Sequence, residues 1–352
     1  MTTLPACDAV TLSGQISSAP FFDDLAVGQV FDRAPSMTLT PGTAAVHQSI
    51  LGDPMRMPLD AALTRAVTGA TAPLAHPAMV SDVAIGQSTL ATQRVKANLF
   101  YRGLTYFRYP VIGDTLYTRT EVVGLKQNSA KPGRDRTGLA ALRMTTVDQA
   151  DRLVLDFYRC AMLPLSVEAP DTGHADDLST IGADAGATTD PTAEWDADAF
   201  RARVPGPHFD PEMAGMVLTS TGDVVSSAPE LARLSLNIAA THHDWRVNGH
   251  RLVYGGHTIG LALAQATRLM PNLVTVLGWD SCDHTGPVRE DDTLYSELHV
   301  EAVRSLPAGR GGVLSLRSLV YAVGGRSAAT PGSSTGEPDR QVLDWRFRAL
   351  LF

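Results

Sequence analysis

The sequence has little cysteine and no long apolar run. Its three cysteines, Cys7, Cys160 and Cys282, are far apart and show no CxxC spacing, so they indicate neither a disulfide framework nor a zinc site. No stretch approaches the ~20 apolar residues of a membrane span, and the first residues lack the basic start and apolar stretch of a signal peptide. We therefore expect a cytoplasmic protein with no membrane span and no metal.

Positive charge is scarce as well. The only lysines are Lys96, Lys126 and Lys131, and the formal net charge is -8. A nucleic acid is therefore not expected as a partner, because polyanions are bound by basic surfaces. The loop KQNSAKPGRDR at 126–136 carries Lys126, Lys131, Arg134 and Arg136. These residues could contact the phosphates of a nucleotide-like ligand, although a solvated hairpin is the simpler interpretation.

Several motifs of common enzyme classes are missing. The sequence contains no GxxxxGK[ST] phosphate loop and no GxGxxG following a strand. The neighbours Asp283 and His284 offer two metal ligands, but two ligands without a third define no site. These absences leave no expected cofactor.

Internal repetition is the main feature that is present. FDDLAVGQV at 22–30 is similar to FDPEMAGMV at 209–217, and the stretch from Pro110 is similar to the stretch from Pro287. DRLVLDFYRCAML at 151–163 aligns without a gap with DRQVLDWRFRALL at 339–351. Three similarities in the same order indicate a tandem duplication of one unit of roughly 150 residues.

The repeats predict the organisation of the chain. We place the N-terminal unit at 18–165, a linker at 166–200 and the C-terminal unit at 201–352. The linker is rich in Asp, Ala, Gly and Thr and poor in large apolar residues, so we expect it to be mobile. A similar stretch at 324–339 indicates a long hairpin loop.

Each unit shows the same succession of elements. Pro41 and Pro229 mark the starts of two amphipathic helices, and Leu231, Leu234 and Ile238 continue the second at helical spacing. More continuously apolar helices follow at 77–91 and 255–270, which must be buried on most sides. Alternating segments rich in β-branched and aromatic residues complete each unit. This pattern predicts an α+β protein with a tandem hot-dog fold, in which each antiparallel sheet curls around a central helix.

Four stretches carry a resemblance to a known family: FFDDLAVGQV, GDTLYTRTEVVGLKQNSAKPG, NIAATHH and RLVYGGHTIGLALA. They resemble the MaoC-like (R-specific) enoyl-CoA hydratases and dehydratases, in the double hot-dog form that includes mesaconyl-CoA hydratase-like proteins. The resemblance covers nearly the whole chain outside the linker. It implies hydration or dehydration of an acyl-CoA thioester, with no cofactor besides the CoA of the substrate.

The resemblance also implies site residues. In the family an Asp and a His five residues later hold the reacting water, and a glycine-bearing turn provides an N–H for the thioester oxygen. These roles transfer to Asn237, His242 and the turn at Gly255 or Gly256, with Tyr254 and His257 beside the turn as substrate contacts. His257 could equally be a structural hydrogen-bonding residue.

The C-terminal unit departs from the family at Asn237. An amide can orient water but cannot take its proton, so His242 is the only matched titrating group and the expected general base. His243 and Asp244 stay without a role. A solvent-facing histidine at a helix end is the alternative interpretation of His242.

The N-terminal unit departs further. Asp53 occupies the aligned acid position, but the histidine is absent and Asp60 lies near its place. Pro77 removes an N–H where a donor is needed. We expect this first site to be degenerate and the unit to serve as scaffold and as a wall of the acyl-CoA tunnel, with Asp53 and Arg56 as a possible surface ion pair.

Two other functions stay open. Asn237 and the altered first unit are compatible with a non-catalytic acyl-CoA or lipid-binding protein. A hot-dog thioesterase would require a carboxylate beside the thioester carbonyl. Acyl-chain length, reaction direction and the choice between a monomer and a homodimer are not determined by these patterns.

Overall fold

The computed structural model describes residues 19–183, 190–247, 249–324 and 338–352. One antiparallel sheet of 12 strands runs through both units in the order β1-β4-β5-β6-β3-β9-β12-β11-β10-β7, with β2 paired to β4 and β8 to β10. The strands are β1 Val30–Phe31, β2 Met37–Thr38, β3 Ala97–Tyr106, β4 Thr115–Gln127, β5 Thr137–Val147, β6 Leu153–Pro164, β7 Val217–Thr219, β8 Asp223–Val224, β9 Leu273–His284, β10 Thr293–Ser305, β11 Gly312–Ala322 and β12 Arg340–Leu351. β3 and β9 pair at the centre and join the two units. The tandem hot-dog prediction is confirmed.

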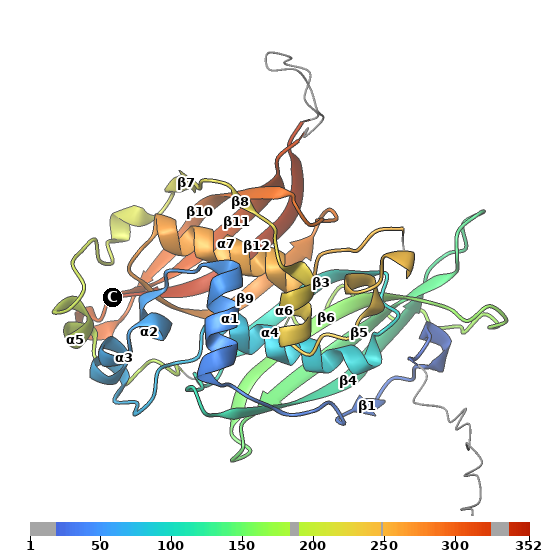
Figure 1. Ribbon diagram of the computed structural model, residues 1–352, viewed down its shortest axis with the longest axis horizontal. Coiled ribbons are helices and arrows are strands. Elements are labelled where there is room, and N and C mark those ends of the chain that lie inside the picture. Colours follow the sequence, from blue (N-terminus) through green and yellow to red (C-terminus); the bar gives the residue numbers. More distant parts are fainter. Residues whose placement is uncertain (1–18, 184–189, 248, 325–337) are drawn as a thin grey trace, which may run out of the picture.

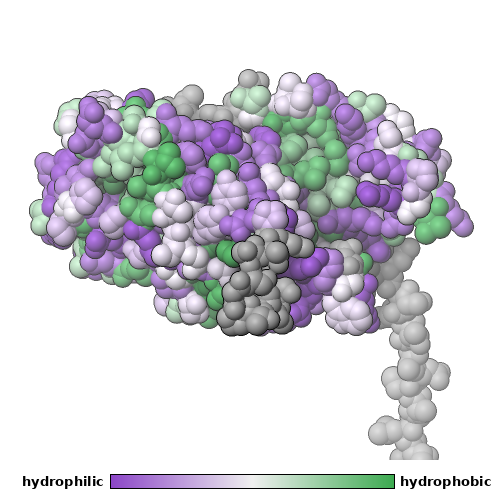
Figure 2. Space-filling view, turned by 90° about the horizontal axis from the view of Figure 1, so that it is seen from above, coloured by the Kyte–Doolittle hydropathy of each residue, from purple (hydrophilic) through white to green (hydrophobic). Residues whose placement is uncertain are grey.

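The helices are α1 Pro41–Leu51, α2 Arg56–Leu59, α3 Ala61–Thr68, α4 Pro77–Gln87, α5 Ala197–Arg201, α6 Ala228–Leu234 and α7 Gly255–Leu269. Among them, α4 and α7 lie against this sheet, and α1 and α6 lie over these two helices (Figure 1). Short 3-10 turns are η1 Phe22–Asp24, η2 Ser88–Ala91, η3 Pro211–Met213, η4 Ala240–His242, η5 Trp245–Val247 and η6 Pro307–Gly309. None of the described helices is long and apolar enough to cross a membrane. Hydrophilic side chains cover much of the face seen in Figure 2, interrupted by separate hydrophobic patches.

α4 and α7 are the central helices of the two units. Every residue of α4 is buried, as are residues 256–267 of α7, and the two helices contact each other. A helix without a polar face can be accommodated only where neighbours cover all its sides. The expectation of two buried central helices is confirmed.

The two units repeat in detail around these helices. In each, a glutamine near the end of the central helix donates to a leucine carbonyl and lies within hydrogen-bond distance of a hydroxyl on the neighbouring strand. The two sets are Gln87 with Leu116 and Thr118, and Gln265 with Leu294 and Ser296. Each member of the second set lies 178 positions after its counterpart.

The second amphipathic helix is shorter than predicted. α6 ends at Leu234, Leu236 has a φ of 62°, and Ile238 is 45% exposed. The chain here crosses α4 so closely that a Cβ on Gly86 would overlap the carbonyl oxygen of Ser235. A continued helix would not fit this approach, so Asn237 lies in a loop.

The prediction of a mobile linker is wrong for its described part. Trp195 and Phe200 are buried, and Phe200 packs edge-to-face against Phe352 at a centroid distance of 5.6 Å. Upstream, Asp176 accepts a hydrogen bond from the N–H of Leu125 at 2.8 Å. Average composition concealed these anchors, because two aromatic side chains can hold a segment that is otherwise polar. Of the predicted loop at 324–339, residues 325–337 lie outside the described part of the chain.

Candidate active site

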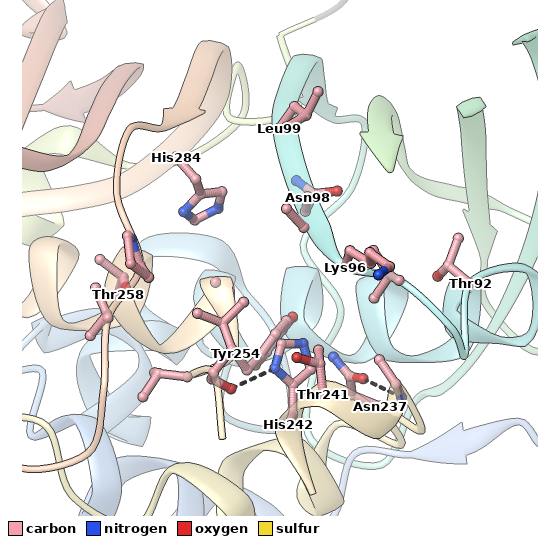
Figure 3. A pocket seen from close by; sticks show the side chains of 18 of the residues that line it. Thr92, Lys96, Asn98, Leu99, Asn237, Thr241, His242, Tyr254, Thr258 and His284 are labelled. Carbon is pink, nitrogen blue, oxygen red and sulfur yellow. Dashed lines mark hydrogen bonds between the residues drawn. The ribbon is translucent and has the colours of Figure 1, made fainter. Parts of the chain in front are cut away.

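A cavity of about 520 Å³ lies between the two units (Figure 3). This volume is typical of small-molecule sites. β3, the end of α4 and β6 contribute residues from the N-terminal unit, while the loop around Asn237, the start of α7 and the end of β9 contribute residues from the C-terminal unit. Among the lining residues, His250 and Thr285 are exposed, whereas Ile85, Thr92 and Arg159 are buried. Residues of the N-terminal unit thus form part of the cavity wall.

His242 presents one ring nitrogen for chemistry. Its Nδ1 lies 2.8 Å from the carbonyl oxygen of Leu252. Because a carbonyl only accepts, Nδ1 carries the hydrogen and Nε2 keeps its lone pair. Burial lowers the pKa of His242 to about 4. The imidazole is therefore neutral at pH 7 and able to accept a proton.

Asn237 lines the same cavity with its side chain held in one orientation. Its Oδ1 accepts from the N–H of Ala239 at 3.0 Å, which leaves the Nδ2 group as the donor; Nδ2 has no hydrogen bond to a described residue. The N-terminal unit holds this loop, since Thr89 Oγ1 accepts from the N–H of Ile238 at 3.0 Å and the Gln93 carbonyl accepts from the N–H of Ala240 at 2.9 Å.

The start of α7 brings a backbone amide to the cavity at Gly255. Tyr254 precedes the helix and its side chain does not cap it, so the first amides keep the positive end of the helix dipole. The Tyr254 ring instead packs edge-to-face on His242 at a centroid distance of 5.7 Å. A side chain at Gly255 has no room, because a Cβ would lie 2.6 Å from Nε2 of His284.

Two predicted substrate contacts do not reach the cavity. Gly256 and His257 are absent from its described lining. A Cβ on Gly256 would overlap the carboxylate of Asp82 on α4, so this glycine serves helix packing. His257 is 0% exposed, and burial lowers its pKa to about 4. The prediction that Gly256 and His257 contact the substrate is therefore wrong for this cavity. Of the two glycines considered as the oxyanion donor, only Gly255 lines the cavity.

The sequence reasoning missed two residues of the cavity. His284 stands at the end of β9, and its buried Nε2 has no hydrogen-bond partner among the described residues. Burial, with His242 nearby, lowers its pKa to about 4. Its neighbour Asp283 forms an ion pair with Arg102 at 2.6 Å. Arg159 on β6 is the second missed residue, and no local motif marks either one.

Several known proteins are similar to this chain in sequence or in structure. No family model matches the chain. A β-methylmalyl-CoA dehydratase from Chloroflexus aurantiacus is 27% identical to this chain, over 87% of this chain and 88% of the relative. A mesaconyl-CoA hydratase from Cereibacter sphaeroides is 25% identical, over 94% of this chain and 97% of the relative. A solved structure from Mycobacterium tuberculosis is a conserved hypothetical protein with a double hot-dog fold. It is 68% identical, has a TM-score of 0.89, and the match covers 95% of this chain and 99% of that protein. A MaoC domain dehydratase structure from Chloroflexus aurantiacus is 25% identical, has a TM-score of 0.78, and the match covers 96% of this chain and 99% of that protein.

The chain belongs to the MaoC-like double hot-dog family.

The first unit of this MaoC-like chain contains a closed counterpart of the site. His76 Nδ1 accepts from the N–H of Ala78 at 3.2 Å, so Nε2 carries the hydrogen, 3.1 Å from Asp53 Oδ2. Asp53 and His76 are both buried. The suggested surface pair of Asp53 with Arg56 is wrong, because Arg56 donates to the loop after α7 instead. Asp60 caps α3 and is not part of the site.

Other polar groups near the MaoC-like site support it from outside. His243 Nε2 lies 2.6 Å from the carbonyl oxygen of Asn237 and holds the loop. Asp244 is bound by Arg246, which lowers the pKa of that carboxyl to about 2. At the cavity wall, Lys96 forms an ion pair with Asp135 of the 126–136 loop at 2.7 Å. The contact of that loop with CoA phosphates stays a prediction.

Proposed function

We propose that this protein hydrates an enoyl-CoA thioester or, in reverse, dehydrates a 3-hydroxyacyl-CoA. The observation that carries the proposal is one cavity lined by both His242, whose Nδ1 is hydrogen-bonded to Leu252 so that Nε2 is left as the proton acceptor, and the start of α7 at Gly255. A proton acceptor and a backbone donor are the two groups that this reaction requires.

The reaction follows from these positions. Nε2 of His242 takes a proton from water while the water oxygen bonds to C3 and the double-bond electrons move toward the thioester oxygen. The Gly255 N–H stabilises the negative charge on that oxygen. The imidazolium then returns its proton to C2 as the carbonyl reforms, so the atoms of one water are added and no cofactor is consumed. Asn237 Nδ2 donates to the water oxygen and orients it.

The substrate class is supported by the relatives. Two curated relatives are named for β-methylmalyl-CoA and mesaconyl-CoA, so their CoA thioesters are the first substrates to examine. The thioesterase alternative loses support, because no Asp or Glu occurs among the described residues that line the cavity. The acyl-CoA-binding alternative is favoured by one observation, the amide of Asn237 in place of an acid.

A direct assay tests the proposal. Crotonyl-CoA, tiglyl-CoA and mesaconyl-CoA are offered to the purified protein, and the loss of the enoyl-thioester absorbance is followed. We expect turnover that falls about 1,000-fold in His242→Ala. His299→Gln, a histidine on β10 outside the cavity, is the matched control and should retain activity. Binding without turnover would support the acyl-CoA-binding alternative, and release of free CoA thiol would support a thioesterase.

The cellular setting is part of the same proposal. We place the protein in the cytoplasm, because few and widely spaced cysteines suit a reducing compartment.

The oligomeric state is open in the proposal. The two units already pair their sheets through β3 and β9, so a monomer and a homodimer of the full chain are both compatible with the site. Light scattering of the purified protein distinguishes them.

A further inference from the structure

Arg159 carries a buried positive charge at the wall of the cavity. It is 3% exposed and lines the cavity with Thr92 and Asn98. Nη2 donates to Thr92 Oγ1 at 2.7 Å and to the Ser88 carbonyl at 3.3 Å, and Nη1 donates to Asn98 Oδ1 at 3.5 Å. Nε has no hydrogen bond to a described residue. All of its described hydrogen-bond partners are neutral.

A buried guanidinium normally has an acid beside it. Arginine cannot shed its proton in a protein, and an unpaired charge in a low-dielectric site is costly. Other partly buried arginines of this chain follow that rule, for example Arg102 with Asp283 and Arg317 with Asp344. Arg159 forms no ion pair with a described carboxylate, and no acidic residue occurs in the described cavity lining.

The duplication shows that the fold does not require this arginine. Arg159 pairs across the sheet with Tyr101, and in the second unit Phe347 pairs with Trp279 in the same way. In the gapless alignment of 151–163 with 339–351, Phe347 is the counterpart of Arg159. Phe347 is fully buried and stacks on Trp345 at 3.9 Å. An apolar ring therefore suffices at this position of the sheet, and the charge has a purpose specific to the cavity.

We infer that Arg159 binds a free carboxylate on the acyl group, so that the preferred substrate is the CoA thioester of a dicarboxylic acid. This inference rests on the proposed function. An acyl chain that passes the exposed residues His250 and Thr285 would bring its far end to the buried residues of the cavity, among them Arg159 and Thr92. Thr92 Oγ1 accepts from Arg159, so its own hydrogen is available to the same carboxylate. The ligand then supplies the counter-charge that the protein lacks.

Two thioesters of nearly equal shape test this inference. Mesaconyl-CoA and tiglyl-CoA differ in that a carboxylate of the first is a methyl group in the second. The wild-type protein should prefer mesaconyl-CoA in kcat/KM by about 100-fold. Arg159→Met should abolish this preference, mainly through the KM for mesaconyl-CoA, and leave tiglyl-CoA within about threefold of the wild type.

Arginine-specific controls separate recognition from folding. Arg143→Met on the neighbouring strand β5, where Arg143 pairs with Asp156 outside the cavity, should leave the preference intact. If Arg159→Met does not fold, Arg159→Lys carries the test; it keeps the charge without the planar fork and should reduce the preference about tenfold. Equal losses for both thioesters would overturn the inference, because Arg159 would then act only by holding Ser88 after the end of α4.

The two proposals can fail separately. If the wild-type protein turns over neither thioester, the proposed hydration fails and binding decides the role of Arg159. Calorimetry with the saturated pair methylsuccinyl-CoA and 2-methylbutyryl-CoA provides this measurement. A preference for methylsuccinyl-CoA that Arg159→Met removes supports carboxylate recognition, and equal affinities contradict it.

Discussion

The central helices of the two units begin with turns of different chemistry. α4 begins with His76 and Pro77, and His76 is tied to the buried Asp53. α7 begins with Tyr254 and Gly255, and Tyr254 packs on His242 at the cavity. The proline of the first turn has no N–H to donate, whereas the glycine of the second lines the cavity and keeps its N–H.

The comparison shows which parts of a duplicated unit can change. The buried glutamine contacts of α4 and α7 are the same in both units, since altering them would leave polar groups unpaired in the core. The turns and the cavity positions are free of that constraint. One site has formed from both units, with His242 from the second and Arg159 from the first.

The largest expected effect comes from giving the second turn the chemistry of the first. Gly255→Pro copies Pro77 and removes the proposed oxyanion donor, so kcat/KM should fall by about 1,000-fold, or roughly 4 kcal/mol of transition-state stabilisation. Steady-state kinetics measure this loss.

Two double variants distinguish the loss of the Gly255 N–H from the steric effect of an added side chain. Gly255→Ala keeps the N–H but places a Cβ against His284, and adding His284→Ala removes that contact. The double variant should be more active than Gly255→Pro combined with His284→Ala. Equal activity of these two doubles would show that the N–H has no catalytic part.

The close approach of the units at Gly86 gives the next largest effect. Gly86→Ala would force the Asn237 loop away from α4, because the added Cβ overlaps the Ser235 carbonyl. We expect the free energy of unfolding to fall by about 3 kcal/mol, measured by urea denaturation. Gly42→Ala is the matched control on α1, where a Cβ lies 3.7 Å from Thr40 Oγ1. If both variants behave alike, the contact with Ser235 does not constrain the loop.

The closed counterpart in the first unit predicts a stability effect without a catalytic one. Asp53→Asn replaces the buried carboxylate that lies 3.1 Å from Nε2 of His76, and we expect a loss of about 2 kcal/mol in the free energy of unfolding. The kcat/KM of the folded variant should match the wild type. A fall in kcat/KM at unchanged stability would instead assign a catalytic part to the first unit.

The smallest effect concerns His257, whose counterpart in α4 is Met79, 178 positions earlier. Burial lowers the pKa of His257 to about 4, while in the unfolded chain it titrates near 6.5. The unfolded state therefore binds more protons between these values, and stability falls as the pH is lowered through that window. His257 should account for about 1 kcal/mol of the loss between pH 7.5 and 6.0.

Urea denaturation at the two pH values measures this contribution. His257→Met, which copies the first unit, should reduce the pH dependence by that amount because methionine does not titrate. An unchanged pH dependence would mean that His257 is protonated equally in the folded and unfolded states.

Local patterns were sufficient for much of the fold. The three similarities between 22–163 and 209–351 predicted the duplication, and the two apolar helices were recognisable because each lacks a polar face. His242 and Asn237 were assigned through the resemblance of NIAATHH, a stretch of neighbouring residues, to the MaoC-like family. Arg159 and His284 were not, because they reach the cavity from strands β6 and β9, distant from that motif in sequence.

The sequence by itself determined the double hot-dog fold, because hydrophobic periodicity and internal repetition can be read along the chain. The resemblance to the MaoC-like family added the assignment of His242 and Asn237. Only the tertiary structure decided that α6 ends at Leu234, that Asp53 is closed off by His76, and that Arg159 faces the same cavity as His242. These outcomes depend on which distant backbones approach one another. Such approaches are set by packing in three dimensions, and the spacing of residues along the chain does not reveal them.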